Sequence, residues 1–225
     1  MFYLKIFINI MKNNLLLFII ILLSFPTFGQ DIKAKKILDK VSKKTRSYKA
    51  MKIEFTNTLE NLQDDIEETL EGTVFIKKNK FKLIYETTEI FCNGRLIWTY
   101  LKDAEEVNIN KLDKKDESIM NPSKLLTIYQ KGYKYRFVSQ GEEDKKIIYV
   151  IDLFPKKPKK KNFSRIRLKI DKDKSEIISI KNFGKDGNHY TLKIKSLEHN
   201  LKLKDNFFKW KKKEHPNIEI IDLRE

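Results

Sequence analysis

The chain has 225 residues, with 47 Lys or Arg against 31 Asp or Glu, and its formal net charge is +16. This length, without a signal peptide, predicts one domain that can bury a hydrophobic core without the help of disulfides or a metal. A charge this high is typical of nucleic-acid-binding proteins, but the lysines are spread along the whole chain and the N-terminus predicts secretion, so nucleic acid is not expected as a partner. The single cysteine, Cys92, excludes an internal disulfide and is expected to be a buried hydrophobe.

The N-terminus has the pattern of a signal peptide. Residues 15–25 read LLLFIIILLSF, with Lys12 before this apolar run and the small residue Gly29 shortly after it. The run is shorter than the ~20 apolar residues that a spanning helix needs. We therefore predict a cleaved signal peptide over residues 1–29, a mature domain over residues 30–225, and export from the cytoplasm. An uncleaved anchor that begins near Phe2 is the alternative.

The first element expected after the signal peptide is an amphipathic helix capped by Asp31. One face of this helix would carry residues at helical spacing: Ala34, Ile37, Leu38, Val41, Thr45 and Tyr48. The opposite face is rich in lysine, which predicts a helix that lies on an apolar surface.

Alternation with a period of two then predicts a series of short strands. Asn93-Gly94 is the strongest hairpin signal in the chain, and Gly141-Glu142 is a second expected turn. The strands are expected within residues 51–56, 69–76, 81–85, 89–92, 96–101, 107–109, 133–138, 147–154, 163–170, 176–183 and 190–197. Residues 121–132 interrupt this series with an Asn cap, a first-turn Pro and a Gly stop, and so predict a short helix.

This order of elements predicts a mainly β fold with some α structure. We expect an unclosed antiparallel β half-barrel, with the helical segments as a lid over a hydrophobic cavity. The expected ligand is apolar, because the inward positions of the strands are mostly Ile, Leu, Phe and Tyr.

Five stretches in the chain, in this order, resemble the outer-membrane lipoprotein carrier family, LolA, in a divergent, Bacteroidetes-like branch. They are residues 48–58, 71–83, 92–100, 121–126 and 208–224. The third reads Cys92-Asn93-Gly94-Arg95-Leu96-Ile97-Trp98-Thr99-Tyr100, similar to the family's D-G-K-x-(apolar)-W-x-Y hairpin. The chain departs from the family at Lys78, where an Arg that holds the lid is usual, and in the missing proline beside it. Lys keeps the charge but lacks the planar fork of Arg.

The resemblance implies a periplasmic chaperone that carries acylated lipoproteins from the inner to the outer membrane. It implies an inner-membrane ABC transporter that loads the carrier, an outer-membrane receptor or direct delivery, a monomer, and no cofactor or metal. Lys78 is the expected lid latch. The residues expected to bind lipid are Phe55, Phe75, Phe81, Leu83, Trp98, Met120, Leu125 and Leu126. Phe81→Glu is expected to block transfer and to leave the fold intact.

Other functions fit the sequence less well. An enzyme is not expected, because the chain has neither a G-x-S-x-G elbow nor an H-E-x-x-H motif. A receptor would need a cysteine at the cleavage site, and a stress sensor would need a second domain. A carrier or sensor of another lipid or glycolipid stays open as the alternative. Lysine-rich residues 156–161 are expected to form an exposed loop, with contact to an anionic membrane as the alternative.

Overall fold

The structure is a computed structural model, and it describes residues 31–61, 63–113 and 132–224. The chain separates into residues 1–30 and one compact unit, residues 31–225. The predicted signal peptide therefore lies outside the described residues. So do three of the predicted lipid contacts: Met120, Leu125 and Leu126.

Helix α2 (Ile32–Ser47) is the one α-helix in the described part of the chain. Asp31 is its N-cap, and the Asp31 carboxylate accepts a hydrogen bond from the Ala34 amide at 2.9 Å. Ala34, Leu38 and Val41 are buried, as the helical spacing predicted. The structure describes no helix that is long and apolar enough to cross a membrane.

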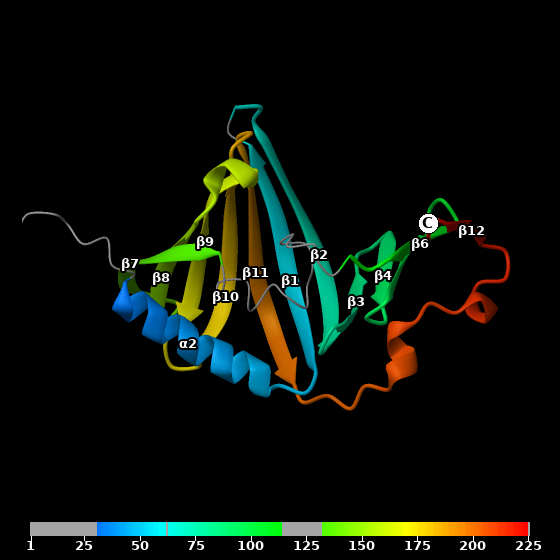
Figure 1. Cartoon of the computed structure of the whole chain (residues 1–225), viewed down its shortest axis with the longest axis horizontal. Coiled ribbons are helices and arrows are strands. Elements are labelled where there is room, and N and C mark those ends of the chain that lie inside the picture. The colour runs from blue at the N-terminus through cyan, green and yellow to red at the C-terminus, as the bar shows by residue number, and fades with distance from the viewer. Residues whose placement is uncertain (1–30, 62, 114–131, 225) are drawn as a thin grey trace, which may run out of the picture. The chain divides into compact units, whose positions relative to one another are not determined.

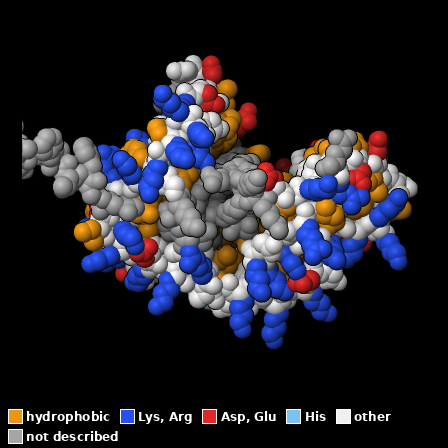
Figure 2. All heavy atoms as spheres, in the orientation of Figure 1, with side chains coloured by type: hydrophobic (Ala, Val, Ile, Leu, Met, Phe, Trp, Pro, Cys, Tyr) orange, Lys and Arg blue, Asp and Glu red, His pale blue; other side chains and the backbone are white. Residues whose placement is uncertain are grey.

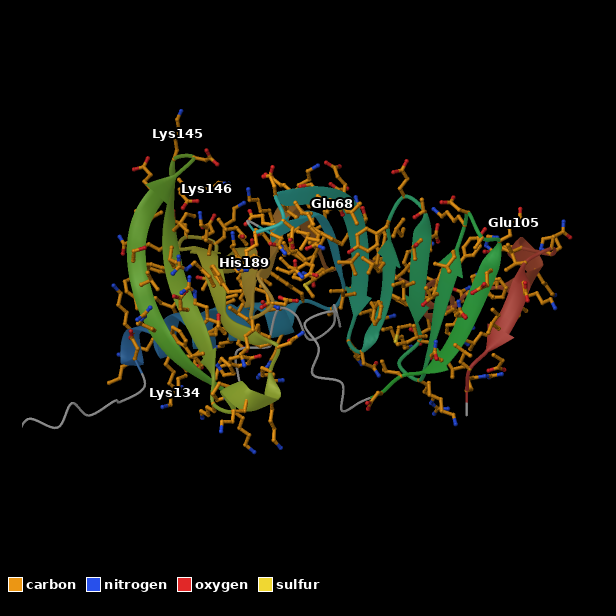
Figure 3. All side chains as sticks on the ribbon, turned by 90° about the horizontal axis from the view of Figure 1, so that it is seen from above. Glu68, Glu105, Lys134, Lys145, Lys146 and His189 are labelled. Carbon is orange, nitrogen blue, oxygen red and sulfur yellow. The ribbon has the colours of Figure 1, made fainter. Side chains whose placement is uncertain are left out.

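Twelve strands form one sheet, which Figure 3 shows as a continuous row from β7, where Lys134 lies, toward Glu105 and the opposite edge. Their order across the sheet is β12-β6-β5-β4-β3-β2-β1-β11-β10-β9-β8-β7. The strands are β1 (Met51–Asn61), β2 (Ile66–Lys77), β3 (Lys80–Ile84), β4 (Thr88–Cys92), β5 (Leu96–Leu101), β6 (Glu106–Lys111), β7 (Tyr133–Glu143), β8 (Lys146–Pro155), β9 (Phe163–Asp171), β10 (Glu176–Gly184), β11 (Asn188–His199) and β12 (Glu219–Asp222).

The sheet confirms the predicted unclosed, mainly β fold. It departs from the predicted antiparallel pairing at one pair of strands. Strands β12 and β6 are parallel, and the other neighbours are antiparallel. Strands β6 and β7 are consecutive in the chain among the strands described, yet they lie near opposite edges of the sheet.

Two turns show where sequence signals succeed and fail. Asn93 and Gly94 form the β4–β5 hairpin as predicted, with Gly94 at φ 90° and the Asn93 side chain accepting from the Leu96 amide. The turn predicted at Gly141-Glu142 is wrong, because both residues continue β7. The chain reverses at Asp144 and Lys145, whose φ angles of 49° and 61° fit a two-residue hairpin.

The two faces of the sheet are covered by different parts of the chain. The inner face is the one that contacts α2, and its core includes Ile53, Val74 and Ile166. On the outer face, the segment of residues 201–218 packs on the strands from β2 to β6. Its Phe208 is fully buried, and its Trp210 packs with Phe91 and Val107. This segment contains the short 3-10 helices η3 (Asp205–Phe208) and η4 (Lys212–Glu214).

Candidate functional site

The inner face is wider than α2 can cover. A helix of 16 residues is about 24 Å long, whereas twelve strands in a row span roughly 50 Å. Figure 1 shows α2 crossing the ends of the strands from β7 to β11, and it contacts β7 and β10. The apolar core continues beyond these strands through β1, β2 and β3 to Cys92 on β4. The inner face is therefore the candidate functional site.

Three predicted lipid contacts lie together on the inner face. Phe55 of β1 is opposite Gly72 of β2, while Phe81 and Leu83 of β3 are opposite Ile76 and Val74 of β2. The exposed fractions of Phe55, Phe81 and Leu83 are 3%, 5% and 7%. Phe81→Glu should therefore destabilise the fold, contrary to the prediction from the sequence, because an unpaired buried carboxylate is strongly destabilising.

The register places two other predicted contacts, Phe75 and Trp98, on the outer face. The Phe75 ring packs edge-on against Phe207 at 5.0 Å, and Trp98 packs against the cluster that contains Trp210. Successive side chains of a strand point to opposite faces, and Phe75 lies between two inward residues of β2. Phe75 and Trp98 therefore do not join the inner-face set and instead pack with residues 201–218.

Three exposed apolar side chains on the inner face were missed by the sequence analysis. They are Ile66 and Leu70 of β2 and Tyr190 of β11, with exposed fractions of 39%, 60% and 43%. Leu70 is opposite Asn57 of β1, and Tyr190 is opposite Leu59. Large exposed apolar residues that gather on one face mark a candidate binding surface. The signal that could have found Ile66 and Leu70 is the period of two, which continues from Val74 back to Ile66.

Gly72 allows two aromatic rings to lie close to the sheet. A Cβ at this position would be 2.7 Å from Phe55 Cζ and 3.0 Å from Tyr85 Cε1. The rings of Phe55 and Tyr85 meet edge to face, with centroids 5.9 Å apart. Burial raises the pKa of the Tyr85 hydroxyl, so this part of the face is apolar even where it carries an oxygen. Gly72 thus marks the boundary between the buried and the exposed parts of the inner face.

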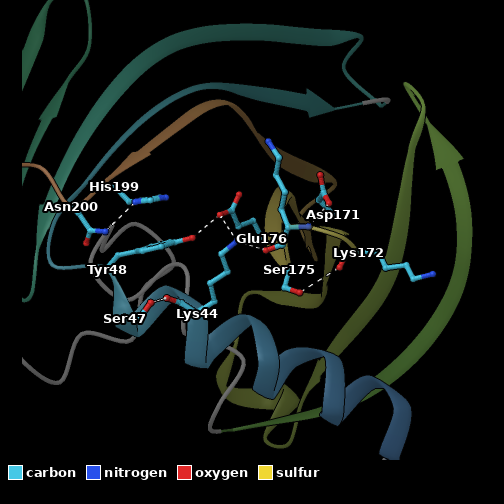
Figure 4. A network of polar contacts seen from close by, with 10 residues as sticks. Lys44, Ser47, Tyr48, Asp171, Lys172, Ser175, Glu176, His199 and Asn200 are labelled. Atoms are coloured by element: carbon cyan, nitrogen blue, oxygen red, sulfur yellow. Dashed lines mark hydrogen bonds and ion pairs between the residues drawn. The ribbon is translucent and has the colours of Figure 1, made fainter.

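The C-terminal end of α2 is held to the sheet by polar contacts (Figure 4). The Tyr48 hydroxyl donates to Glu176 Oε1 at 2.6 Å, and Lys44 Nζ lies 3.0 Å from the same oxygen. The Tyr48 ring stacks on His199 at 4.5 Å. Burial, together with the hydrogen bond to Glu176, raises the pKa of Tyr48. These contacts fix one end of the helix beside β10 and β11.

Lys78, the predicted lid latch, lies in the turn between β2 and β3. Its side chain is exposed and its φ is 58°, in the left-handed region. The turn places the ammonium at the end of the same two strands that carry Phe81 and Val74. The role of Lys78 as a latch stays a prediction.

The described residues offer little for catalysis. They contain no group of His, Cys, Asp and Glu that could hold a metal ion. Burial raises the pKa of the Cys92 thiol, which disfavours the reactive thiolate. A cleft of about 450 Å³ is lined by Leu96, Lys111, Asp222 and Arg224 near the β12 edge, away from Phe55 and Tyr190.

An unclosed sheet whose apolar face is only partly covered by a helix is typical of proteins that bind apolar ligands, and comparison with known proteins gives the family. The family model of the outer membrane lipoprotein carrier protein LolA matches residues 46–211. This chain therefore belongs to the LolA family, whose members are carrier or binding proteins. A search of curated proteins found no significant match.

Two solved structures share the fold at low sequence identity. An uncharacterized conserved protein from Thermus thermophilus is 11% identical, with a TM-score of 0.56, over 84% of this chain and 99% of that one. The Mycobacterium tuberculosis lipoprotein LppX is 11% identical, with a TM-score of 0.50, over 77% of this chain and all of LppX. At these identities the likeness concerns the fold alone.

Proposed function

We propose that this protein is a periplasmic chaperone that carries acylated lipoproteins from the inner to the outer membrane. The acyl chains would lie on the inner face of the sheet, against the exposed side chains of Leu70 and Tyr190 and next to the buried Phe55. An acyl chain in water costs about 0.8 kcal/mol per exposed methylene, so a carrier must supply an apolar surface of this kind.

The exposure of Leu70 and Tyr190 is the observation that carries the proposal. Both are large apolar residues on the inner face, next to its buried core, and 60% and 43% of their surfaces are accessible. A residue that only filled the core would be buried, as Leu83 is. Membership of the LolA family supports acylated lipoproteins as the cargo.

The remaining parts of the mechanism are proposals that follow from the family. An inner-membrane ABC transporter would load the carrier, and the cargo would pass to an outer-membrane receptor or directly to the membrane. Met120, Leu125 and Leu126 would contribute to a lid, and Lys78 would hold that lid closed. A lid held by few hydrogen bonds opens at low cost, which suits a carrier that releases its cargo without a nucleotide.

Native mass spectrometry of the protein purified from the periplasm of its host tests the proposal. We expect one-to-one complexes with acylated lipoproteins. Free phospholipid or glycolipid as the bound species would contradict lipoprotein transport and would favour the alternative, a carrier or sensor of another lipid on the same fold. An empty protein after gentle purification would argue against a carrier.

A matched pair of variants tests the location of the site. Leu70→Gln removes an exposed leucine from the inner face, whereas Leu223→Gln removes one of similar exposure, 52%, near the C-terminus. We expect Leu70→Gln to lower the fraction of protein that carries acylated cargo by roughly tenfold, as the loss of one apolar side chain predicts. Leu223→Gln should leave this fraction unchanged. Equal effects would place the site elsewhere.

A further inference from the structure

The outer face of β7 to β11 carries a group of basic side chains whose positions are set by the strand register. In one row across the sheet, Arg136 of β7, Asp152 of β8, Arg167 of β9 and Lys181 of β10 are directly opposite one another in turn. Beside this row, Arg165 of β9 is opposite Phe183 of β10. The Arg165 guanidinium lies 3.9 Å from the centre of the Phe183 ring.

One buried carboxylate lies within 4 Å of three guanidinium groups. Asp152 is fully buried, and both of its oxygens accept hydrogen bonds from Arg167, at 2.7 and 2.9 Å. Arg136 Nη2 and Arg165 Nε lie 3.6 and 3.9 Å from Asp152 Oδ2. The buried Arg165 Nε has no hydrogen-bond acceptor among the described residues. A single negative charge therefore leaves this cluster with a surplus of positive charge.

The same register places like charges next to each other, which destabilises a sheet. Arg167 is directly opposite Lys181, so their positive charges repel each other. This repulsion is partly offset by the ion pair of Arg167 with Asp152 and by the ion pair of Lys181 with Glu60. A sheet that only had to fold would gain from a neutral or acidic residue at one of these positions. An anionic ligand on this face would remove the repulsion.

A lysine-rich loop extends the basic surface at the end of the same strands. Residues 156–161, between β8 and β9, contain five lysines. Lys185 of the β10–β11 turn donates hydrogen bonds to the carbonyls of Pro158 and Lys161, at 2.6 and 2.8 Å, and so holds the loop beside these strands. Arg165 lies near the start of β9, four residues after the loop ends at Lys161.

The basic side chains on this half of the sheet keep access to solvent. The side chains of Arg136, Lys169 and Arg165 are 61%, 39% and 34% exposed. On the other half, residues 201–218 pack over the outward residues Phe75 and Phe91. On the side of the molecule shown in Figure 2, the Lys and Arg side chains follow the whole periphery and form no single patch.

We propose that the outer face of β7 to β11, together with the loop of residues 156–161, docks the protein on a membrane that contains anionic phospholipid. The cations spread over five neighbouring strands, a width of roughly 19 Å, which suits a plane of headgroups better than one compact anion. Clusters of Lys and Arg bind anionic lipid surfaces through this kind of charge complementarity. The proposal concerns the outer face and holds whatever cargo the inner face carries.

Vesicle sedimentation with the full chain tests this docking. Vesicles of phosphatidylcholine alone are compared with vesicles in which about one third of the lipid is phosphatidylglycerol. Binding to vesicles of phosphatidylcholine alone measures any apolar contribution. The increase in binding caused by phosphatidylglycerol measures the electrostatic contribution and is called the increment below. We expect a large increment that falls about tenfold or more between about 50 mM and about 500 mM salt, because salt screens exposed charges.

Lys193 of β11 is exposed and opposite Ser179 of β10, on the same face as Lys181. A triple variant, Arg136→Gln with Arg165→Gln and Lys193→Gln, removes three cations from the outer face. The control removes three exposed lysines from α2, by Lys36→Gln, Lys40→Gln and Lys43→Gln, so the two proteins have the same net charge. We expect the increment to fall about tenfold in the outer-face variant and about twofold or less in the control. Circular dichroism confirms that both variants are folded, and Lys157→Gln with Lys159→Gln and Lys160→Gln repeats the test on the loop.

Three outcomes would overturn the proposal. The first is the absence of an increment with phosphatidylglycerol. The second is an equal loss in the outer-face and α2 variants, which would mean that net charge alone attracts the protein. The third is tight, salt-sensitive binding of the same face to an acidic protein together with weak binding to vesicles, which would make the partner a protein surface.

Discussion

The carboxylate of Asp31 holds the amide of Phe137, which lies 106 positions later in the chain. Asp31 Oδ2 accepts from the Phe137 N–H at 2.8 Å, while Oδ1 accepts from the Ala34 N–H at 2.9 Å. Phe137 lies on the edge strand β7, where the register shifts between Phe137 and Ser139. One side chain therefore caps α2 and also attaches its first turn to the edge of the sheet.

Asp31→Ala should destabilise the protein by about 2 kcal/mol, because it removes the cap and leaves the Phe137 amide without its acceptor. Asp31→Asn has one side-chain oxygen and should lose about half as much. Urea denaturation followed by circular dichroism gives the free energies of unfolding. Equal values for Asp31→Ala and the unchanged protein would mean that water replaces both hydrogen bonds.

The contribution of Asp31 should depend on pH. The hydrogen bond from the Ala34 amide lowers the pKa of Asp31 below its ordinary value of 3.8, and the bond from Phe137 acts in the same direction against the effect of burial. Because the folded-state pKa is the lower one, the carboxylate stabilises the fold above pH 3.8, and this contribution is lost as the pH falls through the folded value. The stability difference between the unchanged protein and Asp31→Asn should therefore shrink in acid. A constant difference down to about pH 2 would contradict this explanation.

Gly72→Ala should disturb the inner face without the introduction of any charge. The new Cβ would meet Phe55 Cζ at 2.7 Å, so the Phe55 ring must move away from the sheet. We expect a loss of about 1–3 kcal/mol of stability, as for other overpacked sites, and weaker binding of an acyl ligand. Gly141→Ala is the matched control, because nothing lies within 4 Å of a Cβ at that strand position. Similar losses at both positions would point to a general effect of glycine replacement.

The sequence predicted most of the elements, because their signals are local. Helical spacing located α2 and its buried residues, and Asn93-Gly94 located a hairpin. The face of a strand is also a local property. Because side chains alternate between the two faces of a strand, the inward position of Val74 predicts that Phe75 points outward and Leu70 inward. The resemblance to the family instead grouped Phe75 and Trp98 with the cavity.

The sequence could not predict what covers each face, because this depends on contacts between distant segments. Trp98 and Phe75 were predicted as lipid contacts, but in the structure residues 201–218 pack against them. The grouping of Arg136, Arg165 and Arg167 around Asp152 depends on the register of three strands. No short motif encodes that register.

Lys78→Asn tests the predicted latch. Asn tolerates the left-handed backbone of this turn, where φ is 58°, so the fold should be kept while the charge is lost. We expect acyl cargo to dissociate several-fold faster from Lys78→Asn, with an unchanged free energy of unfolding. Lys78→Arg, which restores a planar donor, should slow dissociation. An unchanged rate of cargo dissociation in both variants would mean that Lys78 is a solvated turn residue with no role as a latch.

Asp152→Asn should be the most destabilising of these changes. Asp152 is fully buried and neutralises Arg167, with Arg136 and Arg165 close by, so its loss leaves three guanidinium groups facing one another. Breaking a buried ion pair costs about 3–5 kcal/mol, and we expect about 3 kcal/mol because Arg167 is one-third exposed. Added salt should recover part of this loss, since it screens the repulsion between the arginines. Ile151→Val, a change in packing at the neighbouring buried position, should show no such recovery. The same salt response in both variants would mean that Asp152 acts through packing and hydrogen bonds alone, and the charge surplus argued for the outer face would lose its support.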